Sequence, residues 1–429
     1  NVQIVEVGDP LSLTSDKSTE CYRNWWPGPG SAMVDFTNRS IDLLEQLSIE
    51  TGERFNMNRR GYAFATADAG TAEELRRQAE EAQALGAGPL RVHDGGSGNA
   101  NYIPHTAEGW QNMPTGTDLL LNPALIAKHF PGISPTTTAV AHVRRCGWIR
   151  AQQLGAFFLE QARAHGAKLV RGKVVAITQS NGTVTGVDIE TASSQRHVAT
   201  PTVVLSPGPY LAPVLALLGL HYDITCECHV KIALKDSAAA LPASSPLLLW
   251  SDPVELPWTD DEREVLGADA QTAYLLRPFP AGVHARPEGS PGQHYALALW
   301  TYDIEPSEPA FPIEWDPHLP EIIVRGLTAM LPGMHAYLDP LPRIPVDGGY
   351  YAKTPENRPL VGPLPVAGAY VNAAYSGFGI MTACAGGELL AAHVMGTGLP
   401  SYAQALTPSR YDEPGYLERF ALGAAAGQM

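Results

Sequence analysis

The chain has 429 residues, which is too long for a single hydrophobic core and predicts two domains. Hydrophobic residues make up 45% of the sequence and charged residues 17%, as in ordinary soluble globular proteins. The formal charge of −15 argues against nucleic acid or an anionic membrane surface as a partner, because both attract basic patches.

The sequence shows no pattern typical of a transmembrane segment, a disulfide framework or a metal site. No apolar run approaches the roughly 18 to 20 residues of a membrane span, so no transmembrane segment is predicted. The five cysteines are odd in number and scattered along the chain, which favours a reducing compartment and a cytoplasmic protein. Cys226 and Cys228 have no second pair nearby, so no metal site is expected.

The first hundred residues alternate between strand and helix patterns. Val2 to Val7 is a short β-rich run, Asp35 to Thr51 has apolar residues at helical spacing, and Asn58 to Thr66 has the pattern of a strand. Thr71 to Gly86 is an amphipathic helix, and the spacing of Thr71 and Glu74 predicts a capping box at its start.

The middle of the chain contains the clearest hairpin signal. Gly172 to Thr191 holds two β-rich runs joined through Asn181 and Gly182, a dipeptide that suits a tight hairpin turn. Thr202 to Leu205 is an apolar strand that runs into a turn at Ser206 to Leu215. His221 to Arg343 then predicts a mixed sheet with helical crossings. Its expected strands are 230–234, 246–250, 274–277 and 295–302, and its expected helix is 320–331.

The most informative stretch lies near the C-terminus, in GGYYAKTPENRPLVG (348–362) and AYVNAAYSGFGIMTACAGGELLAAH (369–393). A turn-rich segment leads into a strand, a glycine pair and a helix that begins with small residues. This arrangement brings backbone N–H groups and a helix N-terminus against a flat, electron-accepting ring. The stretch resembles the flavin-contacting end of the D-amino-acid oxidase family, the FAD-dependent amine oxidoreductases that include glycine oxidase, sarcosine oxidase and D-amino-acid dehydrogenase.

The resemblance implies an α/β fold with two discontinuous domains. A Rossmann-like FAD-binding domain of the glutathione-reductase type would comprise 1–50, 141–220 and 345–429. An α+β substrate domain with an antiparallel sheet would comprise 51–140 and 221–344. The implied reaction is oxidation of the C–N bond of a small amine or amino acid, with hydride transfer to flavin N5.

The resemblance also implies contacts at the adenosine end of FAD. Glu6 would accept the ribose hydroxyls, and backbone groups at Val174 or Val175 would hold the adenine. Gly208 lies in a turn that would close over the adenosine and pyrophosphate side. Ser15, Lys17 and Ser18 would bond phosphates or ribityl oxygens, although an exposed Ser/Thr loop is the alternative reading of these residues.

At the ring end, the implied backbone donors border the pyrimidine side of the flavin: Gly377, Phe378, Gly379, Ile380 and Met381. Arg358 is an added charge beside the flavin. It would face the dimethylbenzene edge or a phosphate, or else pair with Glu356.

Two departures from the family pattern affect the chemistry. Gly349 occupies the position of the cysteine that attaches FAD in monomeric sarcosine oxidases, so non-covalent FAD is expected. Met381 occupies the position of a carboxylate-binding lysine. The carboxylate clamp would therefore move to Arg23, Lys353 or Arg325, or the substrate lacks a carboxylate.

Candidate catalytic residues are Tyr302, Tyr351, His229 and Arg23, and the resemblance places the segments of the two tyrosines near the flavin. The aromatic residues would suit a hydrophobic or cyclic amine. His229 and Lys231 share one face of a strand by period-two alternation, and His229 is either a base or an interior histidine.

In this family a strand, a GxGxxG turn and a helix precede the second strand. Here the chain opens on what resembles that second strand, VQIVEVGDP (2–10), and no GxGxxG joins a strand to a helix. We therefore expect an N-terminally incomplete FAD domain, which would leave the chain as given poorly soluble or flavin-free. Restoring about 30 residues with a β-GxGxxG-α pattern should recover binding.

Two other functions compete with amine oxidation. A flavin-free relative that serves as a subunit or scaffold would explain the absent pyrophosphate loop. An NAD-dependent Rossmann dehydrogenase is disfavoured by the return of the chain past Gly362, which is typical of FAD folds. The sequence leaves open the substrate, the electron acceptor and whether the protein forms a homo-oligomer.

Overall fold

A nine-stranded sheet is the largest unit of the computed structural model, which describes residues 2–96, 101–289, 292–302 and 304–420. Two neighbour pairs, β14–β3 and β4–β5, are parallel and the others are antiparallel, so the sheet is mixed, as predicted. Its strands, in spatial order, are β17 (Val346–Lys353), β13 (Thr225–Lys235), β16 (Tyr295–Leu299), β15 (His284–Glu288), β14 (Leu247–Trp250), β3 (Tyr62–Thr66), β6 (Ala139–Val143), β5 (Thr117–Leu120) and β4 (Leu90–His93).

Four smaller sheets complete the β-structure. They are β1 (Gln3–Glu6) with β8 (Lys168–Arg171), β2 (Cys21–Arg23) with β7 (Cys146–Trp148), β11 (Gln195–Ala199) with β10 (Thr183–Glu190) and β9 (Lys173–Ser180), and β12 (Val203–Leu205) with β19 (Ala369–Ala373) and β18 (Leu360–Pro363). Within the described ranges, the β1–β8 sheet and the β12–β19–β18 sheet are separate. The expectation of a preceding β-GxGxxG-α unit stays a prediction.

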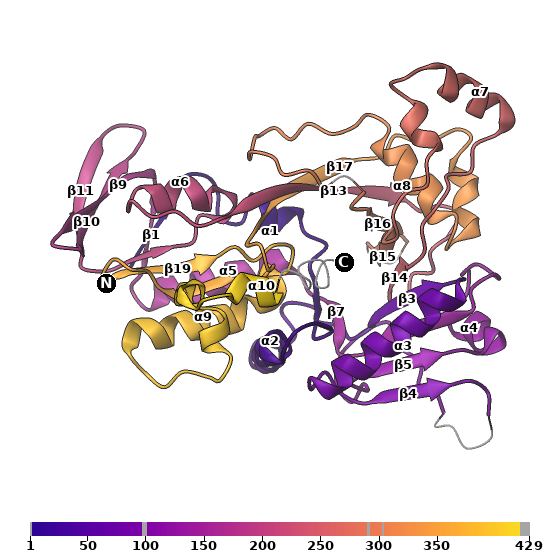
Figure 1. Ribbon diagram of the computed structural model, residues 1–429, viewed down its shortest axis with the longest axis horizontal. Coiled ribbons are helices and arrows are strands. Elements are labelled where there is room, and N and C mark those ends of the chain that lie inside the picture. The colour runs from indigo at the N-terminus through magenta and orange to yellow at the C-terminus, as the bar shows by residue number, and fades with distance from the viewer. Residues whose placement is uncertain (1, 97–100, 290–291, 303, 421–429) are drawn as a thin grey trace.

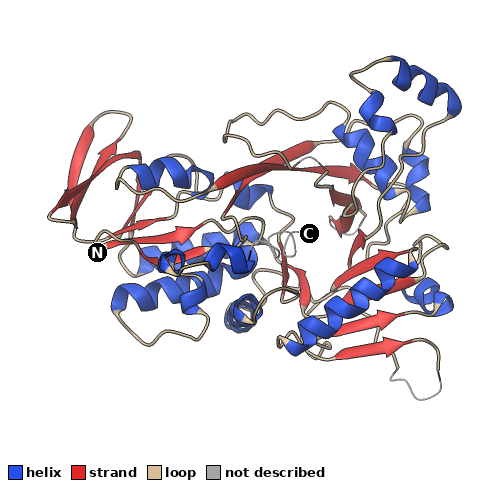
Figure 2. Ribbon diagram, viewed as in Figure 1, coloured by secondary structure: helices blue, strands red, loops and turns tan. Residues whose placement is uncertain are grey.

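The helices divide between the two sides of the molecule (Figure 2). Helices α1 (Thr14–Lys17), α2 (Ala32–Glu50), α5 (Ala151–Ala164), α6 (Leu211–Ala216), α9 (Gly379–Met395) and α10 (Tyr416–Phe420) accompany the small sheets. Helices α3 (Ala69–Ala84), α4 (Pro123–His129), α7 (Asp260–Ala268) and α8 (Leu319–Leu327) accompany the large sheet. Short 3₁₀ turns lie at Gly208–Tyr210, Ala273–Leu276, Pro332–Tyr337, Ala403–Ala405 and Pro408–Asp412.

The hairpin predicted in the middle of the chain is confirmed. The hairpin joins β9 to β10 through Asn181 and Gly182, with φ of 51° and 75°, the left-handed values that a type I′ turn requires. The strand expected at 274–277 is wrong, because Ala273–Leu276 forms a 3₁₀ turn. There Tyr274 donates to Asp316, and Trp258 Nε1 donates to the carbonyl of Leu275.

The start of α3 also differs from its prediction. The helix begins at Ala69 and its N-cap is Asp68, whose carboxylate accepts from the N–H of Thr71 at 2.8 Å. Thr71 and Glu74 do not form the capping box, since Glu74 binds Arg77 one turn further along. Asp accepts this N–H as well as Thr would, and it stands closer to the preceding strand.

Two long strands connect the two sides of the molecule. β13 and β17 run together from the small sheets across to the edge of the large sheet (Figure 1). Helices α2 and α9 pack against each other, and a hydrophobic core there includes Phe36, Phe378 and Leu389. A second core lies under the large sheet and α8 and includes Ile232, Leu248 and Ile323. The start of α9 is thereby fixed opposite β13 and β17.

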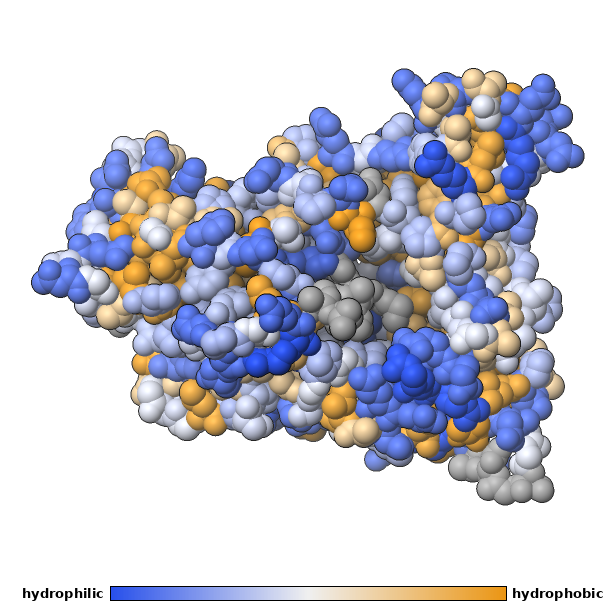
Figure 3. All heavy atoms as spheres, viewed as in Figure 1, coloured by the Kyte–Doolittle hydropathy of each residue, from blue (hydrophilic) through white to orange (hydrophobic). Residues whose placement is uncertain are grey.

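The surface agrees with the acidic, hydrophilic composition. Figure 3 shows hydrophilic residues over most of the face drawn there, with hydrophobic residues in separate patches. Within the described ranges, no helix has both the length and the apolar character that crossing a membrane would require.

Candidate active site

A cavity of about 660 Å³ opens where the start of α9 faces the large sheet. Its volume lies in the range of small-molecule and cofactor sites. The residues that line it and that matter below are Ser18, Thr19, Cys21 and Arg23 near β2, then His229, His284, Thr301 and Tyr351 from the large sheet, and Ser376, Gly377, Phe378 and Met381 around the start of α9.

The turn into α9 carries unusual backbone geometry. Ala374 and Ser376 have φ of 58° and 49°, which non-glycine residues rarely adopt and which cluster at functional sites. The Ser376 hydroxyl is buried and has no hydrogen-bond partner among the described residues. Because the first N–H groups of a helix have no intrahelical acceptor, the start of α9 presents donors and a partial positive charge beside the cavity.

Gly377 is required by a close approach. A Cβ at this position would lie 2.4 Å from Tyr351 Cε2, which is far inside van der Waals contact. The Tyr351 ring in turn stacks on His229, with ring centroids 3.8 Å apart and an angle of 18° between the planes. Burial raises the pKa of Tyr351 to about 12, so this phenol stays protonated at neutral pH.

His229 is held at both ring nitrogens. Its Nε2 lies 3.3 Å from Glu227 Oε2, and its Nδ1 lies 3.2 Å from the hydroxyl of Thr301. Glu227 Oε1 accepts from Lys353 Nζ at 2.9 Å. Burial lowers the pKa of His229, and the hydrogen bond and charge of Glu227 oppose that shift. The sequence placed His229 here but gave no sign of Glu227 or Thr301.

His284 is a second cavity residue that sequence reasoning missed. Its Nδ1 lies 2.9 Å from the carbonyl of Gly282, and since a carbonyl only accepts, Nδ1 carries the hydrogen. Burial, and to a smaller extent the charge of Arg23, lower the pKa of His284 to about 4. No pattern in the sequence singles out this histidine, because it stands at the start of an ordinary strand.

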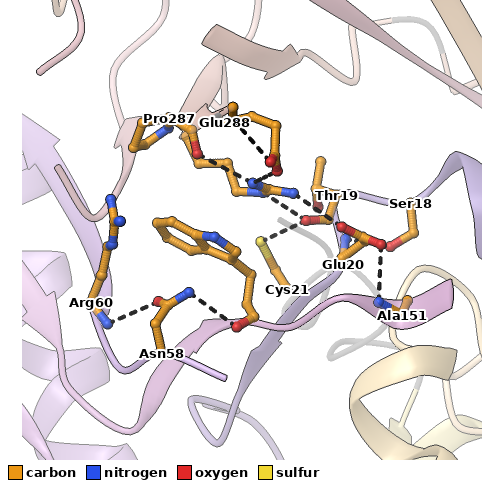
Figure 4. A network of polar contacts seen from close by, with 12 residues as sticks. Ser18, Thr19, Glu20, Cys21, Asn58, Arg60, Ala151, Pro287 and Glu288 are labelled. Atoms are coloured by element: carbon orange, nitrogen blue, oxygen red, sulfur yellow. Dashed lines mark hydrogen bonds and ion pairs between the residues drawn. The ribbon is translucent and has the colours of Figure 1, made fainter. Parts of the chain in front are cut away.

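The segment from Ser18 to Cys21 is held to the large sheet by two cations, the partly buried Lys231 and the buried Arg286. Lys231 Nζ donates to the carbonyl of Ser18 at 2.8 Å, which confirms that Lys231 and His229 point to one face of β13. Arg286 Nε donates to the carbonyl of Thr19 at 2.8 Å, and Arg286 also pairs with Glu20 and Glu288 (Figure 4).

Arg286 lies on one aromatic neighbour as well. Its guanidinium is 5.1 Å from the Trp148 ring centroid, and Arg60 lies 4.9 Å from the same centroid. Such contacts between a guanidinium and a ring are stabilising. Figure 4 shows this network beside Asn58, whose amide donates to the Trp148 carbonyl.

Several residues predicted near the flavin ring lie elsewhere or have other partners. Lys17 forms ion pairs with Asp16 and Asp347, at 2.8 and 3.1 Å, and its expected bond to a phosphate or a ribityl oxygen stays a prediction. Tyr302 lines a second cavity, where it packs on Phe279 and Trp300. Thr301 takes the place expected for Tyr302, because adjacent residues of an extended chain point to opposite faces.

The structure gives Arg358 partners other than Glu356. The pairing with Glu356 is wrong, because Glu356 binds Arg410 at 2.6 Å. Arg358 Nη2 donates to the carbonyl of Pro29 at 2.6 Å, and its guanidinium lies 4.3 Å from the ring centroid of Phe420.

The residues predicted for adenosine gather away from this cavity. Glu6 ends β1 and accepts from the N–H of Gly8 at 3.0 Å. Val174 of β9 packs with Val5 of β1 against the same hydrophobic core, which brings these two strands together. Val175 follows on β9, and Gly208 begins an exposed 3₁₀ turn with φ of 59°. Ser15 lies in α1.

The model for FAD dependent oxidoreductases of the DAO group matches residues 1–393. The chain belongs to this family. No curated protein sequence matches the chain significantly. The predicted family, α/β fold and flavoenzyme class are confirmed.

Solved structures of this family's fold are similar over nearly the whole chain. L-proline dehydrogenase from P. horikoshii has 18% identity and a TM-score of 0.70, with 96% of this chain and 91% of that chain covered. Glycine oxidase from Geobacillus kaustophilus has 16% identity and a TM-score of 0.69, with 95% and 92% covered. Iminodiacetate oxidase from Chelativorans sp. has 15% identity and a TM-score of 0.64, with 95% and 92% covered.

The cavity fits the ring end of the family's cofactor. The first turn of α9, the orphaned Ser376 hydroxyl and the side-chain-free surface of Gly377 all adjoin one cavity of suitable size. Flavins require donors and a partial positive charge beside the pyrimidine part of the ring, and this turn supplies both.

Proposed function

We propose that this protein oxidises the C–N bond of a small amine or amino acid. The observation that carries the proposal is that the start of α9 and the polar wall of His229, Thr301 and Tyr351 bound the same cavity. When bound, FAD accepts the hydride that leaves the carbon next to nitrogen. The names of the similar structures, which include a glycine oxidase and an iminodiacetate oxidase, support this reaction class.

We propose that the backbone from Gly377 to Met381 and the Ser376 hydroxyl hold the ring of FAD, and that Glu6, Val174 or Val175, and Gly208 hold its adenosine end. The proposal includes a non-covalent flavin. At Gly349, the position that matches the attachment cysteine, a Cβ would lie 2.9 Å from Thr14 Cα, so a side chain there would displace α1. The large sheet would form the substrate domain, with β6 and β17 reaching it from segments assigned to the FAD domain.

Arg23 is the proposed partner of a substrate carboxylate. Of the cavity-lining residues that the structure describes, it is the one that carries a permanent positive charge. The other two candidates are not among the described residues that line this cavity. Lys353 binds Glu227, while Arg325 binds Glu262 and Glu321 and lies 3.6 Å from the Trp258 ring centroid.

Anaerobic mixing of the purified, flavin-loaded protein with candidate amines tests the function. We expect the yellow absorption of oxidised flavin to bleach with one substrate class of amine or amino acid. We also expect acid denaturation to release all the colour into the supernatant. A protein that binds no flavin after reconstitution with FAD would favour the scaffold alternative, and bleaching by 2-hydroxy acids alone would overturn C–N oxidation.

Replacing Arg23 should separate substrate binding from chemistry. A lost charge-assisted hydrogen bond costs about 1.5 to 3 kcal/mol, so Arg23→Ala should raise KM for an amino acid by about 10- to 150-fold. The same variant should act normally on the matching amine that lacks a carboxylate. Steady-state kinetics with both substrates provide the check, and an equal rise in KM for both would show that Arg23 does not bind the carboxylate.

A further inference from the structure

Four polar side chains form an unbroken chain of contacts that starts at the cavity. The Thr301 hydroxyl lines the cavity and lies 3.2 Å from His229 Nδ1. Glu227 Oε2 lies 3.3 Å from His229 Nε2, and Lys353 Nζ lies 2.9 Å from Glu227 Oε1. β13 supplies Glu227 and His229, β17 supplies Lys353, and Thr301 follows β16.

Electrostatics fix the direction of this chain. Glu227 pairs with the ammonium group of Lys353, and because a carboxylate only accepts, it must take the hydrogen of His229 Nε2. A neutral imidazole has one N–H only, and therefore Nδ1 presents a lone pair to the Thr301 hydroxyl. The Thr301 oxygen then has its own lone pairs free for a donor inside the cavity.

Amine oxidation requires a group that takes a proton from the substrate nitrogen, and this series of hydrogen-bonded side chains could provide one. An aliphatic ammonium group has a pKa of about 10, so the substrate nitrogen is protonated at neutral pH. Without its lone pair the nitrogen cannot stabilise the positive charge that develops when hydride leaves the adjacent carbon. The proton must therefore leave first.

We propose that Thr301, His229 and Glu227 form a proton relay that deprotonates the substrate ammonium group before the C–H bond breaks; this rests on the proposed function. The N–H bond of the substrate breaks and its proton passes to the Thr301 oxygen, while the Thr301 proton passes to His229 Nδ1. The nitrogen keeps the electron pair. Nothing is oxidised or reduced in this step, and the resulting imidazolium is stabilised by Glu227.

The other groups that face His229 do not compete for this proton. Tyr351, stacked on the imidazole from β17, stays protonated because burial raises its pKa to about 12. His284 on β15 is a much weaker base, since burial lowers its pKa to about 4. Among the other lining residues of the described chain, Glu74 is bonded to Arg77 on α3, and burial raises the pKa of Cys21.

The relay predicts a change in the shape of the pH profile. General-base assistance contributes about 10²- to 10⁴-fold, so His229→Gln should lower kcat/KM by that factor at pH 7. The loss should shrink as pH rises toward the pKa of the substrate amine, because free amine then no longer needs a base. Thr301→Val should behave likewise, whereas Thr301→Ser retains the hydroxyl and should restore most of the rate.

The experiment is the pH dependence of anaerobic flavin reduction, from pH 6 to 10, with wild type and these variants as flavin-loaded full-length proteins. His165→Gln, an exposed histidine outside the cavity, is the matched control and should follow the wild-type profile. A loss in His229→Gln or Thr301→Val that is constant at every pH would overturn the relay and leave a structural role. Failure of the wild type to be reduced by any amine would instead refute the proposed function.

Discussion

Replacing Gly377 by valine should remove most of the bound flavin. The first side-chain atom at this position would lie 2.4 Å from Tyr351 Cε2 and 2.9 Å from Tyr351 Cζ. The Tyr351 ring cannot move freely because it is also stacked on His229, with ring centroids 3.8 Å apart. The turn into α9 must therefore shift, and the N–H groups that face the cavity shift with it. We expect at least a tenfold loss of flavin per protein by visible absorption, roughly 1.4 kcal/mol or more of binding free energy.

The same helix offers a matched control. A Cβ at Gly387 would meet nothing within 4 Å, so Gly387→Ala should keep its flavin. It should also stabilise the fold by up to about 1 kcal/mol, because alanine favours helices over glycine. Gly377→Ala introduces a smaller clash with Tyr351, and removing the Tyr351 ring should relieve it. The double variant Gly377→Ala, Tyr351→Ala should therefore bind more flavin than Gly377→Ala alone. If Gly377→Val retains full flavin content, the flavin ring does not lie against the turn into α9.

The flavin end of the site could be predicted because its parts are contiguous in sequence. The turn, the strand and the small-residue helix all fall within 348–393, so local patterns reveal them. The hairpin at Asn181 and Gly182 was predictable for the same reason, since the φ values it needs are a property of those two residues.

The polar wall of the site could not be predicted, because its contacts cross strands. His229 and Thr301 are 72 residues apart, and Glu227 and Lys353 are 126 apart. The sheet register that joins them depends on side-chain packing along whole strands rather than on any local motif. Tyr302 is a candidate from the sequence because it is aromatic, whereas Thr301 is the one of the two that lines the cavity, and the face that each takes depends on that register.

The partners of charged residues in the loops could not be predicted either, because they too are distant in the sequence. The sequence places Glu356 and Arg358 two residues apart, which makes a local pair plausible. In the structure Glu356 binds Arg410 instead, 54 residues further along the chain. A distant arginine can satisfy the carboxylate with two nitrogens at once, and nothing in the local sequence announces it.

Removing one partner of the buried Arg410–Glu356 pair should be among the most destabilising single substitutions in this protein. The side chains of Arg410 and Glu356 are each only 1% exposed, and Arg410 also donates to the carbonyls of Arg358, Pro359 and Leu406. Arg410→Met would leave a buried carboxylate without its cation and would remove one donor from each of these three carbonyls. Breaking a buried pair in this way costs about 3 to 5 kcal/mol, and we expect that loss in the free energy of unfolding from chemical denaturation at pH 7.

Two further variants distinguish the energetic cost of an unpaired buried charge from the cost of lost packing. The double variant Glu356→Gln, Arg410→Met removes the orphaned charge and should be more stable than Arg410→Met alone. Arg419 and Glu413 form an ion pair at 2.6 Å in which both side chains are about half exposed, so Arg419→Met should cost less than about 1 kcal/mol. Arg410→Met within 1 kcal/mol of wild type would contradict the argument.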